Sequence, residues 1–332
     1  MKEITVAVYG AADQALIRQF PNRKGKWGNC KFIINEHCDY CDYLFMIDSI
    51  KTDLQINCPK ENTYLCICEP AAVKLYSPQY TNQFRHIITF RNVSGYTGEQ
   101  IYDLPMLPWR IGSRYDKIKK CSDMINYLDY DFLSKRITSP KLNKIAIITS
   151  SKTMTNGHRK RLKLLKALKN EIPEYIDIYG NGFQFIEDKW DVFSKYKYVL
   201  TFENCQESQY ITEKIFDAYI AEALPLYWGA PDIERYFPKE SYEIMTFKDI
   251  KETAQHITKL LFNNTYDERL PFILEAKKKV MNEYNIFFRI ATMVENVEKQ
   301  NTVPKTHELY TIEQEHANFP HKLKQKFYRF FK

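Results

Sequence analysis

Apolar and polar positions alternate along the first half of the chain in blocks that predict short strands separated by polar segments. Four apolar runs have the length of buried strands; they are Ile4–Tyr9, Tyr43–Ile47, Tyr64–Cys68 and His86–Phe90. The segments between them predict loops or weakly marked helices. Ser113–Tyr130 is predicted to be helical, and Ser139-Pro140 then marks a boundary, because a proline disfavours helical backbone in the residue before it.

The second half shows a more regular alternation of strands and helices. Its predicted strands are Lys144–Thr149, Tyr175–Tyr179, Lys197–Phe202, Leu224–Trp228 and Tyr242–Phe247. Its predicted helices are Gly157–Asn170, Ile211–Ala223 and further segments that reach about residue 299. Strands that alternate with helices of 10 to 14 residues indicate βαβ units and a parallel sheet with helices on both faces.

Two such halves predict an α/β protein of two Rossmann-like domains that face a central cleft. We place the first domain at residues 1–140, the second at 141–300 and a tail at 301–332. Ligands of open α/β sheets bind beyond the carboxyl ends of the strands. Residues that follow predicted strands are therefore the first candidates for a functional site.

Composition narrows the function classes. The chain has 332 residues, of which 44% are hydrophobic and 27% charged, the balance of a globular protein and not of a disordered one. Only 10 residues are glycine, which argues against a phosphate site built on glycine-rich loops. The net charge is +7, from 48 basic and 41 acidic residues. This charge is compatible with a protein that binds anions.

Cysteine usage and hydropathy predict an intracellular protein with reduced thiols. Six of the eight cysteines precede residue 70, and Cys38 and Cys41 have the C-x-x-C spacing. A structural zinc site would usually add a second such pair or an H-x-x-x-H pair downstream, and neither is present. We see no apolar leader and no run of 18 apolar residues, so we expect cytoplasmic residence without disulfides.

The segment Val199–Trp228 carries the most specific chemistry. Glu203 and Asn204 follow a predicted strand, and a polar loop leads to a helix that opens with Thr212–Lys214. A helix N-terminus attracts anions such as phosphate. Lys214 in the first turn conflicts with the helix dipole, and an anionic ligand such as a diphosphate would remove the conflict. The alternative is an exposed lysine beside an ordinary first-turn acid.

Three pieces of this segment form a recognisable motif: Phe202–Asn204, Tyr210–Lys214 and Ala223–Gly229. The motif resembles the donor site of the α-1,3-fucosyltransferases of glycosyltransferase family 10, most closely the bacterial members. The resemblance covers residues 143 to 250 well and is thin before residue 140. It implies a GT-B fold, a GDP-fucose donor, inversion at the anomeric carbon and no obligatory metal.

The resemblance assigns donor-binding roles to five residues. It places Lys214 on the diphosphate, Glu213 on sugar or ribose hydroxyls, and Tyr210 and Asn204 beside the donor. A family arginine on the helix after the first donor-domain strand aligns best with Arg161, and a guanidinium gives bidentate contacts with phosphate. Arg159 competes for this role. The alternative for this basic cluster is a solvated helix face.

The resemblance also implies a general base in the first domain. The family uses a glutamate just after a strand, and Glu69 follows the predicted strand Tyr64–Cys68 and precedes Pro70. Cys68 stands where the family usually has glycine, so an ordinary acid at a strand end is the alternative. Downstream, Leu104–Pro108 matches the proline-containing stretch of the family at the domain crossover.

The tail from Asn318 to Lys332 has five basic residues, six hydrophobic ones and no acid. A short basic, aromatic segment suits the surface of an anionic membrane, and bacterial relatives often end similarly. We therefore expect a cytoplasmic protein with peripheral contact at the inner face of the membrane. A disordered or self-packed tail is the alternative.

The acceptor follows from the resemblance alone. It implies a hydroxyl of a glycan with N-acetylglucosamine or glucose, oligosaccharide or lipid-linked, an α-1,3 linkage and a role in glycosylation or surface polysaccharide assembly. The rivals are a GT-B transferase that uses another sugar nucleotide and an inactive relative that binds glycans. A nucleic-acid-binding protein is disfavoured, because the chain lacks a recognition-helix or RNP signature.

Overall fold

A computed structural model describes residues 2–10, 14–116, 118, 121–151, 153, 156–300 and 306–315. The chain forms two compact units. The first comprises Met1–Pro108 together with Tyr284–Lys332, and the second comprises Trp109–Glu283. This division differs from the predicted boundaries at residues 140 and 300. The crossover follows the proline-containing stretch, and the last long helix returns to the first unit.

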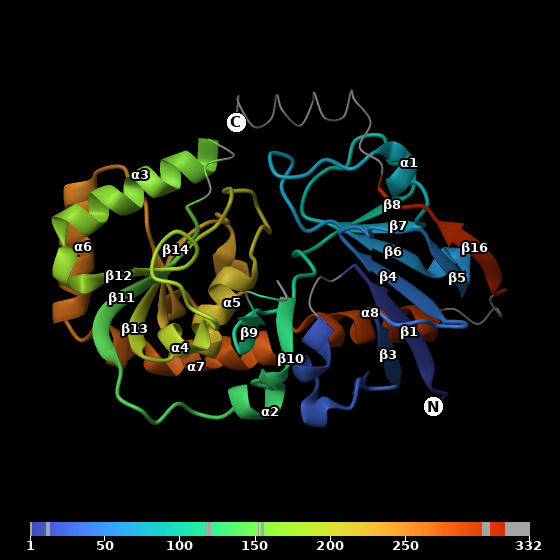
Figure 1. The fold of residues 1–332 in the computed structure, drawn as a ribbon, viewed down its shortest axis with the longest axis horizontal. Coiled ribbons are helices and arrows are strands. Elements are labelled where there is room, and N and C mark those ends of the chain that lie inside the picture. The colour runs from blue at the N-terminus through green and yellow to red at the C-terminus, as the bar shows by residue number, and fades with distance from the viewer. Residues whose placement is uncertain are drawn as a thin grey trace. The chain divides into compact units, whose positions relative to one another are not determined.

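The first unit is built on a seven-stranded sheet in the order β2-β3-β1-β4-β6-β7-β8 (Figure 1). All neighbouring strands are parallel except the β2–β3 pair. The strands are β1 (Ile4–Tyr9), β2 (Lys26–Trp27), β3 (Cys30–Ile34), β4 (Tyr43–Ile47), β6 (Thr63–Cys66), β7 (His86–Thr89) and β8 (Glu99–Tyr102). The predictions for β1 and β4 are confirmed residue for residue, since continuous apolar runs are typical of parallel strands buried on both faces.

Short helices connect these strands, and a long one covers the sheet. The short helices are α1 (Pro78–Thr81) and the 3-10 turns at Gln14–Gln19, Pro21–Arg23 and Lys60–Asn62. The long helix, α8 (Ile286–Gln300), buries its apolar face in the core formed by β1, β3, β4 and β6. Within this core, the ring centroids of Phe287 and Phe20 are 4.2 Å apart. This packing explains why α8 belongs to the first unit although it follows the second in sequence.

The described part of the C-terminal segment adds a strand that the apolar pattern does not predict. β16 (Glu308–Ile312) pairs antiparallel with β5 (Leu54–Cys58). Its residues are mostly exposed, and only Ile312 is fully buried, in the core of the first unit. The basic tail from Asn318 to Lys332 lies outside the described residues.

The second unit contains a five-stranded parallel sheet in the order β12-β11-β13-β14-β15. Its strands are β11 (Leu142–Ile148), β12 (Ile176–Tyr179), β13 (Tyr196–Phe202), β14 (Leu224–Trp228) and β15 (Glu243–Ile244). Its helices are α2 (Tyr130–Leu133), α3 (Asn156–Glu171), α4 (Trp190–Phe193), α5 (Glu213–Ile220), α6 (Ile250–Phe262), α7 (Thr265–Met281) and 3-10 turns at Pro173–Tyr175, Ile233–Arg235 and Lys239–Ser241. The predicted alternation of strands and helices is confirmed here, and α3 packs beside α6 and α5 beside α7 (Figure 1).

The helix predicted over Ser113–Tyr130 is wrong. The structure has an antiparallel pair there, β9 (Ser113–Asp116) and β10 (Cys121–Tyr127), with a register shift between Ser122 and Tyr127. The backbone N–H of Tyr115 also bonds the carbonyl of Glu187, 2.9 Å away. Pairing between the two strands, together with this bond to a distant residue, thus replaces the hydrogen bonds that a helix would supply.

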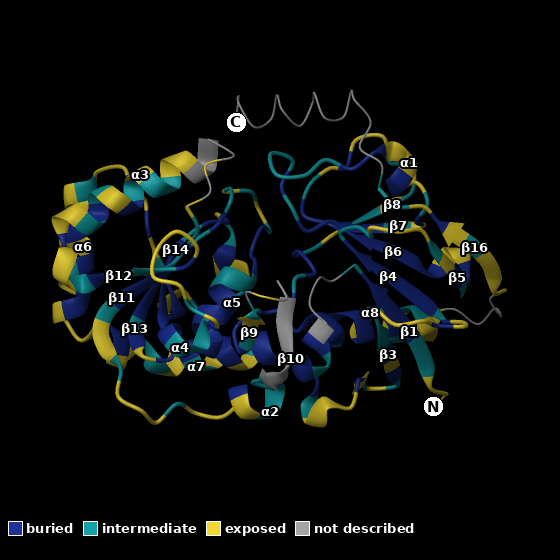
Figure 2. Ribbon diagram, viewed as in Figure 1, coloured by how far each residue is buried: buried dark blue, intermediate teal, exposed yellow. Residues whose placement is uncertain are grey.

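Burial follows the layers in each unit (Figure 2). The strands of both parallel sheets are largely buried, whereas α3 and α6 each present an exposed face. Among the residues that the structure describes, no helix combines the length and the apolar character needed to cross a membrane.

Candidate functional site

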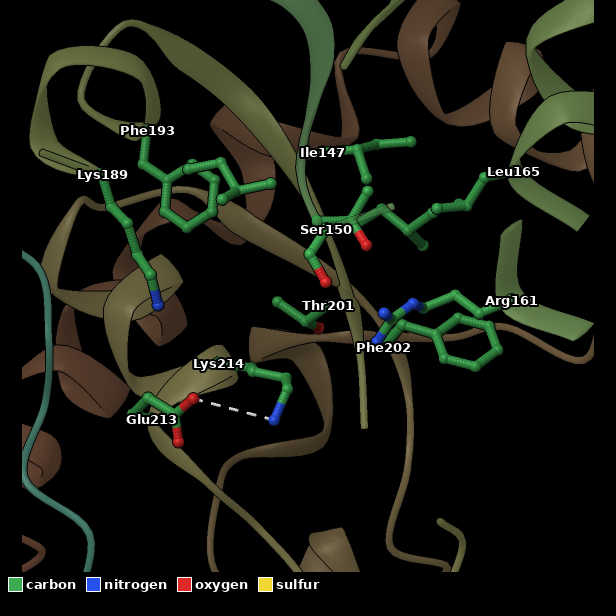
Figure 3. Close-up of a pocket in the computed structure, with 13 residues that line it drawn as sticks. Ile147, Ser150, Arg161, Leu165, Lys189, Phe193, Thr201, Phe202, Glu213 and Lys214 are labelled. Carbon is green, nitrogen blue, oxygen red and sulfur yellow. Dashed lines mark ion pairs between the residues drawn. The ribbon is translucent and has the colours of Figure 1, made fainter. Parts of the chain in front are cut away.

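A cavity of about 360 Å³ lies where β11 and β13 end in the second unit (Figure 3). The carboxyl ends of parallel strands are where open α/β sheets bind ligands. The lining side chains come from the two strands and their following segments and from α3, α4 and α5. They are Ile147, Ile148, Thr149, Ser150, Arg161, Leu165, Lys189, Phe193, Leu200, Thr201, Phe202, Glu213 and Lys214.

Helix α3 brings Arg161 to this cavity and leaves Arg159 outside it. Leu165, one turn after Arg161, is buried and lines the same wall. The Arg161 Nε is buried and has no hydrogen-bond partner in the part of the chain that the structure describes, and burial lowers the pKa of the guanidinium. Arg159 is exposed and donates from Nη1 to the carbonyl of Thr153, 2.7 Å away. The geometry therefore favours Arg161 for an anion in the cavity.

The N-terminus of α5 brings Lys214 to the cavity through a buried network. Thr212 caps the helix and accepts a hydrogen bond from the Lys214 backbone N–H. Lys214 Nζ lies 3.1 Å from Glu203 Oε2 and 3.1 Å from Thr212 Oγ1. Glu203 is fully buried and also accepts from the backbone N–H of Thr212 at 2.9 Å. A carboxylate beneath the lysine thus offsets its conflict with the helix dipole.

Glu213 is the carboxylate that lines the cavity. Its side chain is 19% exposed, and Oε1 lies 3.7 Å from Lys214 Nζ. Burial alone would raise its pKa, but the charges of Lys214, Lys189 and Arg110 hold the pKa down at about 2. Glu213 is therefore ionised at neutral pH and able to accept hydrogen bonds from hydroxyl groups.

Asn204 and Tyr210, also predicted at the donor, do not line this cavity. They lie together in the loop between β13 and α5, where Asn204 Nδ2 donates to the Tyr210 hydroxyl at 3.4 Å. Tyr210 is almost completely buried. In this structure the pair supports the loop that precedes α5.

Sequence reasoning missed several cavity residues. Thr149 and Ser150 follow β11 directly, and the Thr149 Oγ1 is buried without a hydrogen-bond partner. Their position directly after a strand could have identified them as candidate site residues. Lys189 had no such signal, because it lies between a loop and the short helix α4. Phe202, the last residue of β13, stacks on Trp228 with ring centroids 4.1 Å apart.

Glu69, the predicted base, belongs to the first unit, whereas every cavity residue belongs to the second. It follows β6 and is partly buried. Its backbone carbonyl accepts a hydrogen bond from Arg91 Nε at 3.1 Å, and Arg91 Nη2 donates to the carbonyl of Lys74 at 3.0 Å. The residues after the strand are thus held by a guanidinium from the end of the next strand.

The described residues contain no cluster of three or more His, Cys, Asp or Glu side chains suited to a metal ion. Cys38 and Cys41 are both buried and free. Burial raises the pKa of the Cys38 thiol to about 11. The Cys38 thiol is therefore protonated at neutral pH.

Comparisons with known proteins match the part of the chain that holds the cavity. Residues 139–309 match the model of the C-terminal part of glycosyltransferase family 10 (fucosyltransferase). An alpha-(1,3)-fucosyltransferase of Helicobacter pylori is 40% identical over 73 residues, which cover 22% of this chain and 15% of that protein. A GDP-fucose protein O-fucosyltransferase 3 of Xenopus laevis is 35% identical over 89 residues, 26% of this chain and 19% of that protein.

One solved structure has a related fold over nearly the whole chain. The crystal structure of an alpha1,3-fucosyltransferase with GDP gives a TM-score of 0.50 at 17% identity, over 91% of this chain and 92% of that one. This likeness confirms the GT-B fold expected from the sequence. The matches to the two curated relatives each span less than a fifth of the relative's length.

Proposed function

We propose, from the premise that this chain belongs to glycosyltransferase family 10, the fucosyltransferases, that it transfers L-fucose from GDP-fucose to a hydroxyl group of a glycan. One observation carries the proposal. The cavity at the strand ends gathers Arg161, Lys214 and the ionised Glu213, and the buried Nε of Arg161 has no hydrogen-bond partner among the described residues. An anionic group with attached hydroxyls suits this set of side chains.

The proposed donor site stabilises the leaving diphosphate with fixed cations. Negative charge builds on the diphosphate as it departs, and preorganised positive groups stabilise that charge in the transition state. Arg161 offers a planar pair of donors, and Lys214 offers an ammonium at the N-terminus of α5. Glu213 accepts hydrogen bonds from sugar or ribose hydroxyls, and we assign Asn204 and Tyr210 to the loop that supports this arrangement.

The proposed reaction is one displacement with inversion at the anomeric carbon. The acceptor oxygen forms a bond to C1 of fucose while the bond from C1 to the diphosphate oxygen breaks, and that electron pair leaves with GDP. The acceptor proton passes to the carboxylate of Glu69. Its position after β6, at the carboxyl end of the first parallel sheet, supports this role.

We also propose that no obligatory metal assists the departure of GDP. Arg161 and Lys214 line the cavity beside the α5 N-terminus, and they can balance a diphosphate in the absence of a divalent ion. Transfer should therefore continue in the presence of a chelator.

The acceptor is the most specific part of the proposal. We propose an α-1,3 linkage to N-acetylglucosamine or glucose in an oligosaccharide or lipid-linked glycan, supported by the match to an alpha-(1,3)-fucosyltransferase. A second match is named as a protein O-fucosyltransferase. A test of acceptors should therefore include peptides as well as glycans.

The test combines donor binding with transfer. Titration calorimetry of the full chain with GDP-fucose, GDP-mannose and a UDP-sugar measures donor choice. Radiolabelled GDP-fucose with an array of glycans and peptides, with and without EDTA, then measures transfer and metal dependence. Binding of GDP-fucose and labelling of a glycan with N-acetylglucosamine or glucose are expected.

Each other outcome contradicts a defined part of the proposal. Preference for another sugar nucleotide would overturn the donor. Donor binding without transfer or hydrolysis would indicate an inactive member that binds glycans. Labelling of peptides alone would overturn the glycan acceptor, and loss of transfer in EDTA would overturn the absence of a metal requirement.

A further inference from the structure

A second lysine, Lys189, lines the same cavity on the side opposite Arg161 (Figure 3). It precedes α4 and lines the cavity together with Arg161 and Lys214. Figure 3 shows its side chain extending toward the space above Glu213. Its Nζ lies 2.5 Å from the Asp217 carboxylate, and the lysine side chain is 26% exposed.

Asp217 is a fully buried carboxylate whose other oxygen is also occupied. Its Oδ1 accepts hydrogen bonds from the backbone N–H groups of Arg110 at 2.8 Å and Ile111 at 3.0 Å. It lies on α5, one turn after Glu213. The pair with Lys189 is therefore fixed to the helix that also supplies the first-turn cavity residues.

The two lysines of the cavity have the same construction. Lys214 is 25% exposed and rests on Glu203, which is fully buried and accepts from a backbone N–H. Lys189 is 26% exposed and rests on Asp217, which is fully buried and accepts from two backbone N–H groups. A buried carboxylate that is bound on both sides holds each ammonium in a defined place at the cavity wall.

The Lys189 ammonium keeps capacity for a ligand. An ammonium group has three N–H donors, and the contact with Asp217 uses one of those of Lys189. Three cations line the cavity, whereas Glu213 is its one lining carboxylate among the described residues. The surplus of positive charge at the cavity wall suits a ligand with more than one negative charge.

We propose that Lys189 is a third donor-binding cation, held in place by Asp217, that contacts the diphosphate of the donor together with Arg161 and Lys214. This inference rests on the proposed GDP-fucose donor and extends it to a residue on a different segment. Asp217 is then a positioning residue, since it acts through the lysine.

Calorimetry with GDP and with guanosine separates a phosphate contact from a structural role. The main variant is Lys189→Gln. Its side-chain amide can still donate a hydrogen bond to Asp217, so the buried carboxylate keeps a partner. GDP should bind about ten- to a hundred-fold more weakly, as expected for one charge-assisted hydrogen bond, while guanosine binding stays unchanged. Lys189→Arg should recover part of the GDP affinity.

Lys195→Ala is the matched control, because Lys195 is exposed and lies outside this cavity; it should bind GDP as the natural chain does. Equal GDP affinity of the Lys189→Gln variant and the natural chain would overturn the inference and leave the proposed function standing. Equal losses for GDP and guanosine, with a lower melting temperature, would assign Lys189 a structural role and also overturn it. Failure of the natural chain to bind GDP would instead overturn the proposed function.

Discussion

At the scale of single residues, charge and burial separate side chains that look equivalent in the sequence. Arg159 and Arg161 are two positions apart in one basic run. On a helix this spacing turns them to different faces. One guanidinium therefore reaches the cavity with an unpartnered Nε, and the other bonds a backbone carbonyl at the surface.

We predict that Arg161→Ala weakens GDP binding about ten- to a hundred-fold, because a charged hydrogen-bond donor to phosphate is lost. Arg159→Ala is the matched control and should leave the affinity within about twofold. Titration calorimetry of both variants measures the effect. The reverse ranking would show that Arg159 is the phosphate arginine.

Glu69 tests the assignment of the base. Glu69→Gln keeps the size of the side chain and removes its ability to take a proton, so we expect kcat to fall by roughly a hundred-fold or more. The KM for GDP-fucose should stay nearly constant, since the proposed role of Glu69 is to take the acceptor proton and not to hold the donor. The control is Glu61→Gln, an exposed acid of the same unit. Unchanged turnover in the Glu69 variant would refute the assignment.

Glu213 gives a prediction for pH. Its folded-state pKa of about 2 lies below the ordinary value of 4.5, so its ionised form stabilises the fold above pH 4.5, and this contribution is lost as the pH falls toward 2. The unfolding free energy of the natural chain minus that of Glu213→Gln should therefore shrink between pH 6 and pH 3, by about 2 kcal/mol. Urea titrations at several pH values measure it, and a difference independent of pH would contradict it.

The motif and the structure agree on some site residues for a physical reason. Residues within one strand–loop–helix segment, such as Lys214 and Glu213, reach the cavity because local geometry decides their place. Lys189 and Asp217 could not be found in this way. Their contact joins α5 to a different segment, and single-sequence patterns carry no signal for such a tertiary pair.

At the scale of elements, the N-terminus of α5 depends on Thr212. Its hydroxyl contacts both oxygens of Glu203, at 3.0 and 2.8 Å, and accepts from the Lys214 backbone N–H. We predict that Thr212→Ala costs about 1–2 kcal/mol of stability, as for other helix caps, and weakens GDP binding because Lys214 loses part of its support.

Thr212→Ser is the control for this prediction, since it keeps the hydroxyl. Urea unfolding gives the stability and calorimetry gives the affinity. If the serine and alanine variants lost the same amount of both, the methyl group and not the cap would be responsible.

The same scale shows which elements a sequence can predict. Continuous apolar runs located β1, β4 and β14 to the residue, because buried parallel strands need apolar side chains on both faces. The β9–β10 pair and β16 were not predicted, because backbone pairing, of β9 with β10 and of β16 with β5, defines these strands in place of a continuous apolar run. The boundary between the two units after Pro108 was not predicted either, because it depends on the packing of α8 against the first unit.

At the scale of the whole molecule, positive charge is concentrated in two segments. The stretch from Lys152 to Lys169 and the tail from Asn318 are both rich in lysine and arginine and free of acids. Within α3 the exposed lysines include Lys160, Lys163 and Lys166. Both segments would be attracted to an anionic surface, but the tail alone adds a cluster of aromatic side chains.

We propose that the tail holds the protein at the cytoplasmic face of an anionic membrane. Basic residues near such a surface contribute about 1 kcal/mol each, and aromatic residues add burial at the interface. Replacing Lys322, Lys324 and Lys326 by glutamine should therefore weaken binding to vesicles with phosphatidylglycerol by roughly a hundred-fold. Replacing Lys160, Lys163 and Lys166 removes the same charge from α3 and should have a much smaller effect. Cosedimentation with vesicles measures both variants, and equal losses would indicate diffuse attraction, whereas unchanged binding of the tail variant would refute the tail as the contact.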